Sequence, residues 1–483
     1  MATANPQALL KRLLLEQTET TWLEFKQNNC DPELIGRTIS ACANAAMLLE
    51  RERAFIVWGI ENKSKKRLGT TVRLKEVKKG NENLENWLAH VIDPSLMMEL
   101  IDFEEDGKLF SILSFEPTYT RPVKFIGIEY IRIGENVRPL KDHDEHERSL
   151  WLATSRRKFE SAVALPHQSA AEVFEILNTA TYYERSRQTP PTTPQEVLRK
   201  FCSLGALRED MEGGYDITNL GAILFANDLT QFPFISTKSV RVIKYSGLDK
   251  RNSEEETEGR RGYAVGFPGM LKYISERLPK EEKYERGVRQ LVNKYSATAV
   301  REIIANALIH QDFTISGAGP VVEIYQDRVE VTNPGNSLVE LYRIIDERRS
   351  RNEKLAQAMR DMGLCEERGG GIDKAILEIE EMFLPAPLFL PSVNSMRVVM
   401  PGPRKFNQLS KSDKIWSCYC HCVVRWIRQD FMSNTTLRER FSLDDEEYQM
   451  ASDVIANSKK AKLIKPADPT QGNKFAKYIP YWA

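Results

Sequence analysis

The spacing of apolar and polar positions changes several times within the first 150 residues. Residues 31–49 (DPELIGRTISACANAAMLL) repeat apolar positions every three to four residues, which predicts an amphipathic helix. Residues 53–62 (RAFIVWGIEN) form an apolar run interrupted by Gly59 and predict a buried strand. The same spacing rules predict helices over 6–18 and 84–92, and strands over 21–26, 100–105, 109–115 and 129–134. This mixture predicts an α+β domain over residues 1–150.

The remaining chain predicts further domains. Residues 151–235 form a mainly helical connector containing the proline break QTPPTTP. Residues 236–403 contain the helical pattern 300–313, the hairpin pattern 321–335 (VVEIYQDRVEVTNPG) and the charged, turn-prone segment 254–263. In residues 411–483, three helical patterns precede two short strands, which is winged-helix order. The expected fold class is therefore α+β multidomain.

Composition restricts the function only weakly. The chain has 483 residues with 68 basic and 68 acidic side chains, so nucleic-acid binding needs local basic patches rather than a global field. Its seven cysteines follow no disulfide framework, which favours a reducing, cytoplasmic compartment. Cys418, Cys420 and Cys422 are expected to pack in a core, not to bind zinc. No apolar run reaches the length of a membrane span, so no membrane partner is expected.

The helical pattern VREIIANALIHQDF, residues 300–313, carries the most informative chemistry. Glu302 and Asn306 lie four residues apart and therefore share one helix face. A carboxamide oxygen can hold a hard cation while a neighbouring carboxylate orients water. Two glycine-containing segments follow, NPG at 333–335 and RGGG at 368–371, and the second opens a helical pattern. Because helix N-termini and glycine turns favour anions, this order indicates a nucleotide site.

This order of motifs resembles the GHKL ATP-binding fold in its divergent form, over roughly residues 238–400. The resemblance implies an α/β sandwich that binds ATP and Mg²⁺, with Mn²⁺ as a substitute. Asn306 resembles the residue that holds Mg²⁺, and Glu302 the one that activates water. Asn333 stands where most members carry the adenine-reading aspartate. The glycines of the two boxes would be Gly335 and then Gly369, Gly370 and Gly371, and Arg351 belongs to an SRN element expected to face phosphate.

The blocks LEFK, ISACANAA, VWGIEN, RPVKF and YIRIGENVRPL resemble the AlbA-like domain of the Schlafen family. The resemblance implies contact with nucleic acid, either RNA or DNA. In its nuclease-active members three acids bind divalent metal, and the matching positions here are Glu19, Glu24 and Glu61. Clustered carboxylates of this kind can hold cations beside a scissile phosphate. A domain that binds without cutting is the alternative.

Basic side chains supply candidate nucleic-acid contacts, although such runs are usually solvated loops. In the first domain they are Lys63, Lys65, Lys66, Arg67 and Arg132, and in the predicted winged helix they are Lys459 and Lys460.

Three functions remain open at this point. The first is a switch controlled by ATP and Mg²⁺ that acts on nucleic acid, with GHKL-type ATPase and metal-dependent endonuclease as its two candidate activities; cleavage would favour RNA and suit phage defence. The second is an ATP-binding, DNA-binding transcription regulator without nuclease activity. The third is an interaction scaffold. A homodimer or higher homo-oligomer is expected, because GHKL-type domains often dimerise when they bind ATP.

Overall fold

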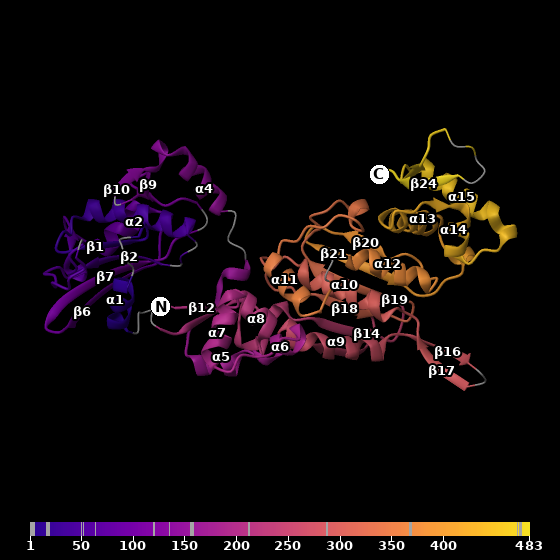
Figure 1. Ribbon diagram of the computed structural model, residues 1–483, viewed down its shortest axis with the longest axis horizontal. Helices are drawn as coiled ribbons and strands as arrows, with labels where there is room; N and C mark the ends of the chain where they lie inside the picture. The colour runs from indigo at the N-terminus through magenta and orange to yellow at the C-terminus, as the bar shows by residue number, and fades with distance from the viewer. Residues whose placement is uncertain are drawn as a thin grey trace. The chain divides into compact units, whose positions relative to one another are not determined.

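The computed structural model describes residues 5–15, 20–49, 51, 53–62, 64–118, 121–134, 136–154, 159–210, 213–285, 288–366, 370–470, 472 and 476–483. Glu19, Lys63 and Gly369 lie outside these ranges. The chain divides into two compact units, which are described separately (Figure 1). The first contains Met1–Lys158 with Glu209–Gly214, and the second contains Phe159–Arg208 with Tyr215–Ala483.

The first unit is built around one buried helix, α2 (Pro32–Leu48), which packs on strands from two sheets. Asp31 caps its start by accepting a hydrogen bond from the backbone N–H of Glu33. The two sheets have the orders β1-β2-β7-β6 and β10-β9-β8-β5. Their strands are β1 (Leu23–Lys26), β2 (Ala54–Trp58), β5 (Ile92–Asp93), β6 (Met98–Glu105), β7 (Lys108–Phe115), β8 (Lys124–Phe125), β9 (Ile128–Ile133) and β10 (Asn136–Pro139). The other elements are α1 (Pro6–Leu15), β3 (Lys78–Lys79), β4 (Glu82–Asn83), α3 (Leu84–Val91) and α4 (Asp144–Thr154).

Asn44 shows how α2 is fixed to the sheet that contains β8 and β9. Its side chain is fully buried, and its Nδ2 donates to the carbonyls of Val123 and Tyr130 at 2.9 and 2.8 Å. Its Oδ1 accepts from the Val123 backbone N–H at 2.7 Å. All of the polar capacity of this amide is used for structure, because burying it unpaired would be costly.

The second unit begins with a small sheet and short helices. The three-stranded sheet has the order β11-β13-β12, where β12 lies at the boundary between the units. The helix α8 packs against this sheet and against α9 and α11. The elements are β11 (Val163–Gln168), α5 (Ala170–Ile176), α6 (Ala180–Ser186), α7 (Pro194–Ser203), β12 (Leu207–Glu209), β13 (Tyr215–Thr218) and α8 (Asn219–Phe225).

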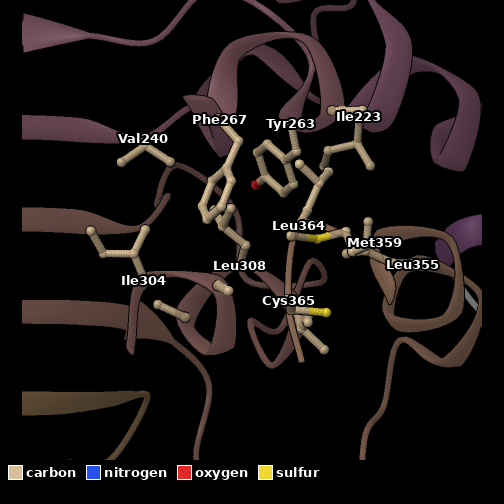
Figure 2. Close-up of a cluster of buried hydrophobic side chains, with 14 of the residues drawn as sticks. Ile223, Val240, Tyr263, Phe267, Ile304, Leu308, Leu355, Met359, Leu364 and Cys365 are labelled. Carbon is tan, nitrogen blue, oxygen red and sulfur yellow. The ribbon is translucent and has the colours of Figure 1, made fainter. Parts of the chain in front are cut away.

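A six-stranded sheet with the order β15-β14-β18-β19-β21-β20 forms the centre of the second unit. Val322 and Val331 face each other across the β18–β19 hairpin that the sequence predicted, and both contribute to the core under the helices. Figure 2 shows part of this core, where side chains from α8, α9, α10 and α11 meet. The elements are β14 (Arg241–Tyr245), β15 (Ser253–Glu258), α9 (Tyr263–Arg277), β16 (Lys280–Glu285), β17 (Val288–Asn293), α10 (Ala297–Ile309), β18 (Val321–Ile324), β19 (Arg328–Pro334), α11 (Glu353–Asp361), α12 (Gly371–Glu381), β20 (Leu388–Pro391) and β21 (Ser395–Pro401).

The segment 254–263, expected to form a charged turn, instead begins as the edge strand β15. Its acidic side chains pair with basic ones on neighbouring elements, as in Lys244–Glu254 at 2.6 Å and Arg277–Glu255 at 2.6 Å. Charges supplied by β14 and α9 therefore stabilise a strand that its own sequence disfavours.

The last part of the second unit, residues 411–483, is called the C-terminal domain below. It contains α13 (Lys411–Ile427), β22 (Met432–Ser433), α14 (Asn434–Phe441), α15 (Tyr448–Lys460), β23 (Ile464–Pro466) and β24 (Lys477–Pro480). The three helices and the β23–β24 hairpin follow the order that the sequence predicted, but the strand β22, which pairs with β24, was not predicted. The winged helix itself stays a prediction. Cys418, Cys420 and Cys422 are buried on α13, as expected for core residues. Burial raises the pKa of the Cys418 thiol to about 12, so it stays protonated at neutral pH.

Candidate nucleotide site

A cavity of about 280 Å³ opens in the second unit between α10, the N-terminus of α12, β19, β21 and the segment 336–352. This segment, which joins Gly335 to α11, is called the lid segment below. The size is near the lower end for small-molecule sites. Five of the residues predicted to bind nucleotide line this one cavity together with Glu302: they are Asn306, Asn333, Gly335, Arg351 and Gly371.

Glu302 and Asn306 point into the cavity from the same face of α10. The Asn306 Nδ2 donates to the backbone carbonyl of Glu302 at 2.8 Å, which directs its Oδ1 away from the helix backbone. The Glu302 side chain is 1% exposed, and its Oε1 accepts from the guanidinium of Arg301, at 3.0 Å from Nε. The pair therefore presents one amide oxygen and one oriented carboxylate, a donor set suited to a hard cation and a water molecule.

Gly371 brings the start of α12 directly against this pair. A Cβ atom at this position would lie 2.8 Å from Glu302 Oε2 and 3.3 Å from Asn306 Nδ2. A larger residue would displace the Glu302 carboxylate, since real Cβ atoms do not approach an oxygen to 2.8 Å, and it would crowd the Asn306 amide. The first backbone N–H groups of α12 are consequently held beside the amide and the carboxylate, where a phosphate could accept from them. Gly370 is the N-cap of α12 and does not line the cavity.

Gly335 and Arg351 form a second close contact, at the beginning and end of the lid segment. Gly335 has a φ of +99°, and a Cβ there would meet the guanidinium of Arg351 and lie 2.6 Å from Asp312 Cβ. Arg351 Nη1 pairs with Asp312 Oδ2 at 3.1 Å, and Nη2 donates to the Asn336 carbonyl at 2.8 Å. Arg351 thus ties the lid segment to the loop after α10, and its predicted contact with phosphate stays a prediction.

The opposite wall of the cavity is apolar, and the sequence did not indicate it. Phe389 on β20 and Met396 and Val398 on β21 line the cavity beside Asn333. Asn333 is 6% exposed and pairs with Met396 in the sheet register. Its Nδ2 donates to the Pro334 carbonyl at 3.3 Å, so its Oδ1 remains as an acceptor at the edge of an apolar slot. Such a slot with one polar group suits a flat heterocyclic base.

Two titratable side chains in the cavity have shifted pKa values. Burial, followed by the charge of Arg351, lowers the pKa of His310 to about 4, so this imidazole is neutral at pH 7. The imidazole therefore adds no positive charge to the cavity at neutral pH. Burial, followed by the charge of Glu302, raises the pKa of Cys365 to about 12. Its thiol lines the cavity as a protonated, weakly polar group.

In the first unit, Glu24 is held by two cations. Its Oε2 lies 2.7 Å from Arg132 Nη1, and its Oε1 lies 2.9 Å from Lys26 Nζ. The Arg132 side chain is fully buried and also donates to the Leu23 carbonyl at 3.1 Å. Arg132 was predicted to contact nucleic acid, but buried in this way it cannot reach a phosphate. A metal at Glu24 would first have to displace these cations.

Glu61 is exposed and lies beyond the end of β2, five positions past Ile56, the residue that pairs with Glu24. Among the described residues, no group of three metal-ligating side chains includes Glu24 or Glu61. Because Glu19 lies outside the described residues, the predicted acidic trio stays a prediction.

The basic side chains predicted to contact nucleic acid differ in their exposure and in the contacts that they already make. Lys65 lies over the Phe25 ring at 5.5 Å, and Arg67 forms an ion pair with Glu105. Lys66 is exposed on the same loop. In the C-terminal domain Lys459 and Lys460 are both exposed near the end of α15.

Comparison with known proteins gives two domain matches. Residues 19–141 match the family model described as "Schlafen, AlbA_2", and residues 317–400 match the one described as "Putative ATP-dependent DNA helicase recG C-terminal". The curated proteins contain no match. Among solved structures, the DIP2311 protein from Corynebacterium diphtheriae has 14% identity and a TM-score of 0.44, covering 98% of this chain and 96% of that chain. A likeness of this size defines neither the fold nor the function.

Residues 19–141 therefore match a Schlafen AlbA_2 domain, and residues 317–400 match a RecG-type domain of GHKL-like character, as the sequence predicted. Together these domains indicate a nucleic-acid-related, ATP-binding protein. The second match begins after α10, so Glu302 and Asn306 are assigned by the cavity geometry alone. Throughout the described residues, no helix is both long and apolar enough to span a bilayer.

Proposed function

We propose that the cavity of the second unit binds ATP with a divalent cation, and that this binding controls how the first unit engages nucleic acid. The observation that carries the proposal is the convergence of Asn306, Glu302 and Gly371. The Asn306 amide, an oriented carboxylate and the start of a helix lie in contact there.

In this proposal each part of the nucleotide would occupy its own region of the cavity. Asn306 would hold the cation, whose charge would neutralise the phosphates, and the N-terminus of α12 would receive a phosphate. The slot beside Phe389 and Met396 would take the base, with Asn333 Oδ1 accepting from an exocyclic amino group. Glu302, fixed by Arg301, is the group that would orient water if the nucleotide is hydrolysed.

Nucleotide binding is tested by titrating Mg·ATP into wild type and Asn306→Ala. The matched control is Asn457→Ala, because Asn457 also donates to the backbone carbonyl four residues before it, that of Asp453, at 2.7 Å. We expect Asn306→Ala to lose at least tenfold in affinity and the control to bind normally. Equal binding by all three proteins would refute the site.

For the first unit we propose regulated nucleic-acid binding, with cleavage as the competing outcome. Pairing of Glu24 with Arg132 and Lys26 supports this choice, since both carboxylate oxygens are already neutralised. The domain match supplies the link to nucleic acid.

The competing outcome is tested with labelled RNA and DNA, Mn²⁺ or Mg²⁺, and either ATP or no nucleotide. We expect a shift in binding between the two nucleotide conditions and intact nucleic acid. Cutting that disappears in Glu61→Gln, a change at an exposed position, would establish the nuclease instead. Neither binding nor cutting under any condition would leave the scaffold function.

A further inference from the structure

The middle of the lid segment is built into the C-terminal domain. Tyr342 lies among three aromatic rings of that domain, with centroid distances of 5.9 Å to Tyr419, 6.1 Å to Trp416 and 6.4 Å to Tyr481. The Tyr419 hydroxyl donates to the Tyr342 carbonyl and accepts from Trp482 Nε1 at 3.1 Å. These contacts fix the lid backbone as well as one of its side chains.

The next residue of the lid segment strengthens the attachment. The Arg343 guanidinium lies 4.0 Å from the centre of the Trp482 ring. The same guanidinium pairs with Asp346 at 2.6 Å and Glu347 at 3.0 Å, both in the lid segment. The Arg343 guanidinium therefore does two things: it pairs with acidic side chains of the lid segment, and it packs on the Trp482 ring of the C-terminal domain.

Ile344, Ile345 and Ile372 connect the cavity to the same domain. All three line the cavity. Ile345 is 4% exposed and belongs to the apolar core of the C-terminal domain, and Ile344 and Ile372 pack against that core. These isoleucines therefore form a wall between the cavity and the core of the C-terminal domain. A ligand in the cavity would contact one side of this wall, and the core contacts the other.

A second link runs through α12, whose first residue touches the acid and amide pair. Near its other end, Glu380 Oε2 lies 2.9 Å from His421 Nδ1, and its Oε1 lies 3.2 Å from Arg440 Nε. Glu380, His421 and Arg440 are all buried, so these pairs connect α12 to α13 and α14 away from solvent.

We propose that Tyr419 and Trp482 are positioning residues for the nucleotide site, and that nucleotide binding and attachment of the C-terminal domain to the lid segment are reciprocally coupled. The proposal rests on the proposed ATP site. Coupling of this kind requires that each event favour the other by the same factor, typically about 5- to 150-fold. The C-terminal domain would then sense the nucleotide state directly, through the wall that it shares with the cavity.

The test compares wild type, Tyr419→Phe and Trp482→Leu, with Tyr448→Phe as the control. Tyr448 lies on α15 of the same domain and is 58% exposed. We measure the affinity for a fluorescent ATP analogue with Mg²⁺, and hydrogen exchange of residues 336–352 with and without this ligand. We expect both variants to bind roughly 5- to 50-fold more weakly and to exchange the lid segment faster, while the melting temperature and the control stay unchanged.

The outcomes separate the two proposals. If wild type binds the analogue but both variants bind as tightly, the coupling is refuted and the nucleotide site stands. If wild type does not bind, the proposed function fails. Faster exchange of residues 336–352 in Tyr419→Phe without ligand would then still establish the attachment, and unchanged exchange would refute it. If the melting temperature of Tyr419→Phe falls below that of wild type, the nucleotide affinity and the lid-segment exchange of Trp482→Leu test the coupling instead.

Discussion

Glu302 in the second unit and Glu24 in the first are both glutamates in mostly enclosed positions beside an arginine, but their surroundings differ. Glu302 uses one oxygen for Arg301, and its other oxygen faces Gly371 and the cavity. Glu24 has a cation on each oxygen, Arg132 on one and Lys26 on the other. A buried carboxylate indicates a ligand site only where one of its oxygens remains unpaired and space is left beside it.

The largest effect should come from filling the space beside Glu302. We expect Gly371→Ala to weaken nucleotide binding roughly 100-fold, because the new methyl group would displace Glu302 and Asn306. Alanine favours a helix over glycine, so stability should not fall for that reason. Gly269→Ala in α9 is the control, since nothing lies within 4 Å of its Cβ position. Titration calorimetry measures the nucleotide affinity of each protein. If Gly371→Ala bound nucleotide as tightly as wild type, the space beside Glu302 would not be a ligand site, and Glu302 would not differ from Glu24 in this respect.

The next effect concerns Glu24, where a loss of stability is expected. Glu24→Gln leaves Arg132 buried without its anionic partner, which should cost about 3 kcal/mol of unfolding free energy in the first unit. The exposed pair Arg73–Glu104, at 3.4 Å, provides the contrast, and Glu104→Gln should cost less than about 1 kcal/mol. Denaturant unfolding measures both. A stable Glu24→Gln protein that has lost a metal-dependent activity would make Glu24 catalytic.

His310 allows a test at lower pH. The unfolded chain takes up a proton on this imidazole near pH 6.5, whereas the folded protein does so only near pH 4. This contribution to stability is therefore complete above pH 6.5 and is lost as the pH falls toward 4, by about 3 kcal/mol. His310→Gln should flatten this part of the profile for the second unit. A profile identical to that of wild type would mean that the imidazole protonates as it does in water.

The smallest effect belongs to Lys66, the exposed member of the basic loop in the first unit. If Lys66 contacts a phosphate, Lys66→Gln should lower nucleic-acid affinity a few-fold and reduce the salt slope by about 1. Lys141→Gln, also exposed in this unit, serves as the control. Binding measured at several salt concentrations checks this, and parallel salt dependences for the three proteins would exclude the contact.

Local patterns predicted the regular elements well. The helices α2 and α10 and the β18–β19 hairpin follow from spacing alone, because each buries one face of its own sequence. The strand β15 was missed, since its acidic residues are neutralised by partners far along the chain, such as Arg277.

The same limit applies to the candidate site. Glu302 and Asn306 share a helix face, so their proximity follows from the helical period. The contact of Gly371 with both, and the apolar wall of Phe389 and Val398, depend on packing between distant segments. The pairing of Arg351 with Asp312, 39 residues earlier, could not be predicted for the same reason.

The most direct test is a crystal structure with Mn²⁺ and a non-hydrolysable ATP analogue, in which the anomalous signal locates the metal. We predict a metal peak about 2.1 Å from Asn306 Oδ1, with a phosphate at the N-terminus of α12. A metal bound elsewhere, with no contact to Asn306, would contradict the proposed site.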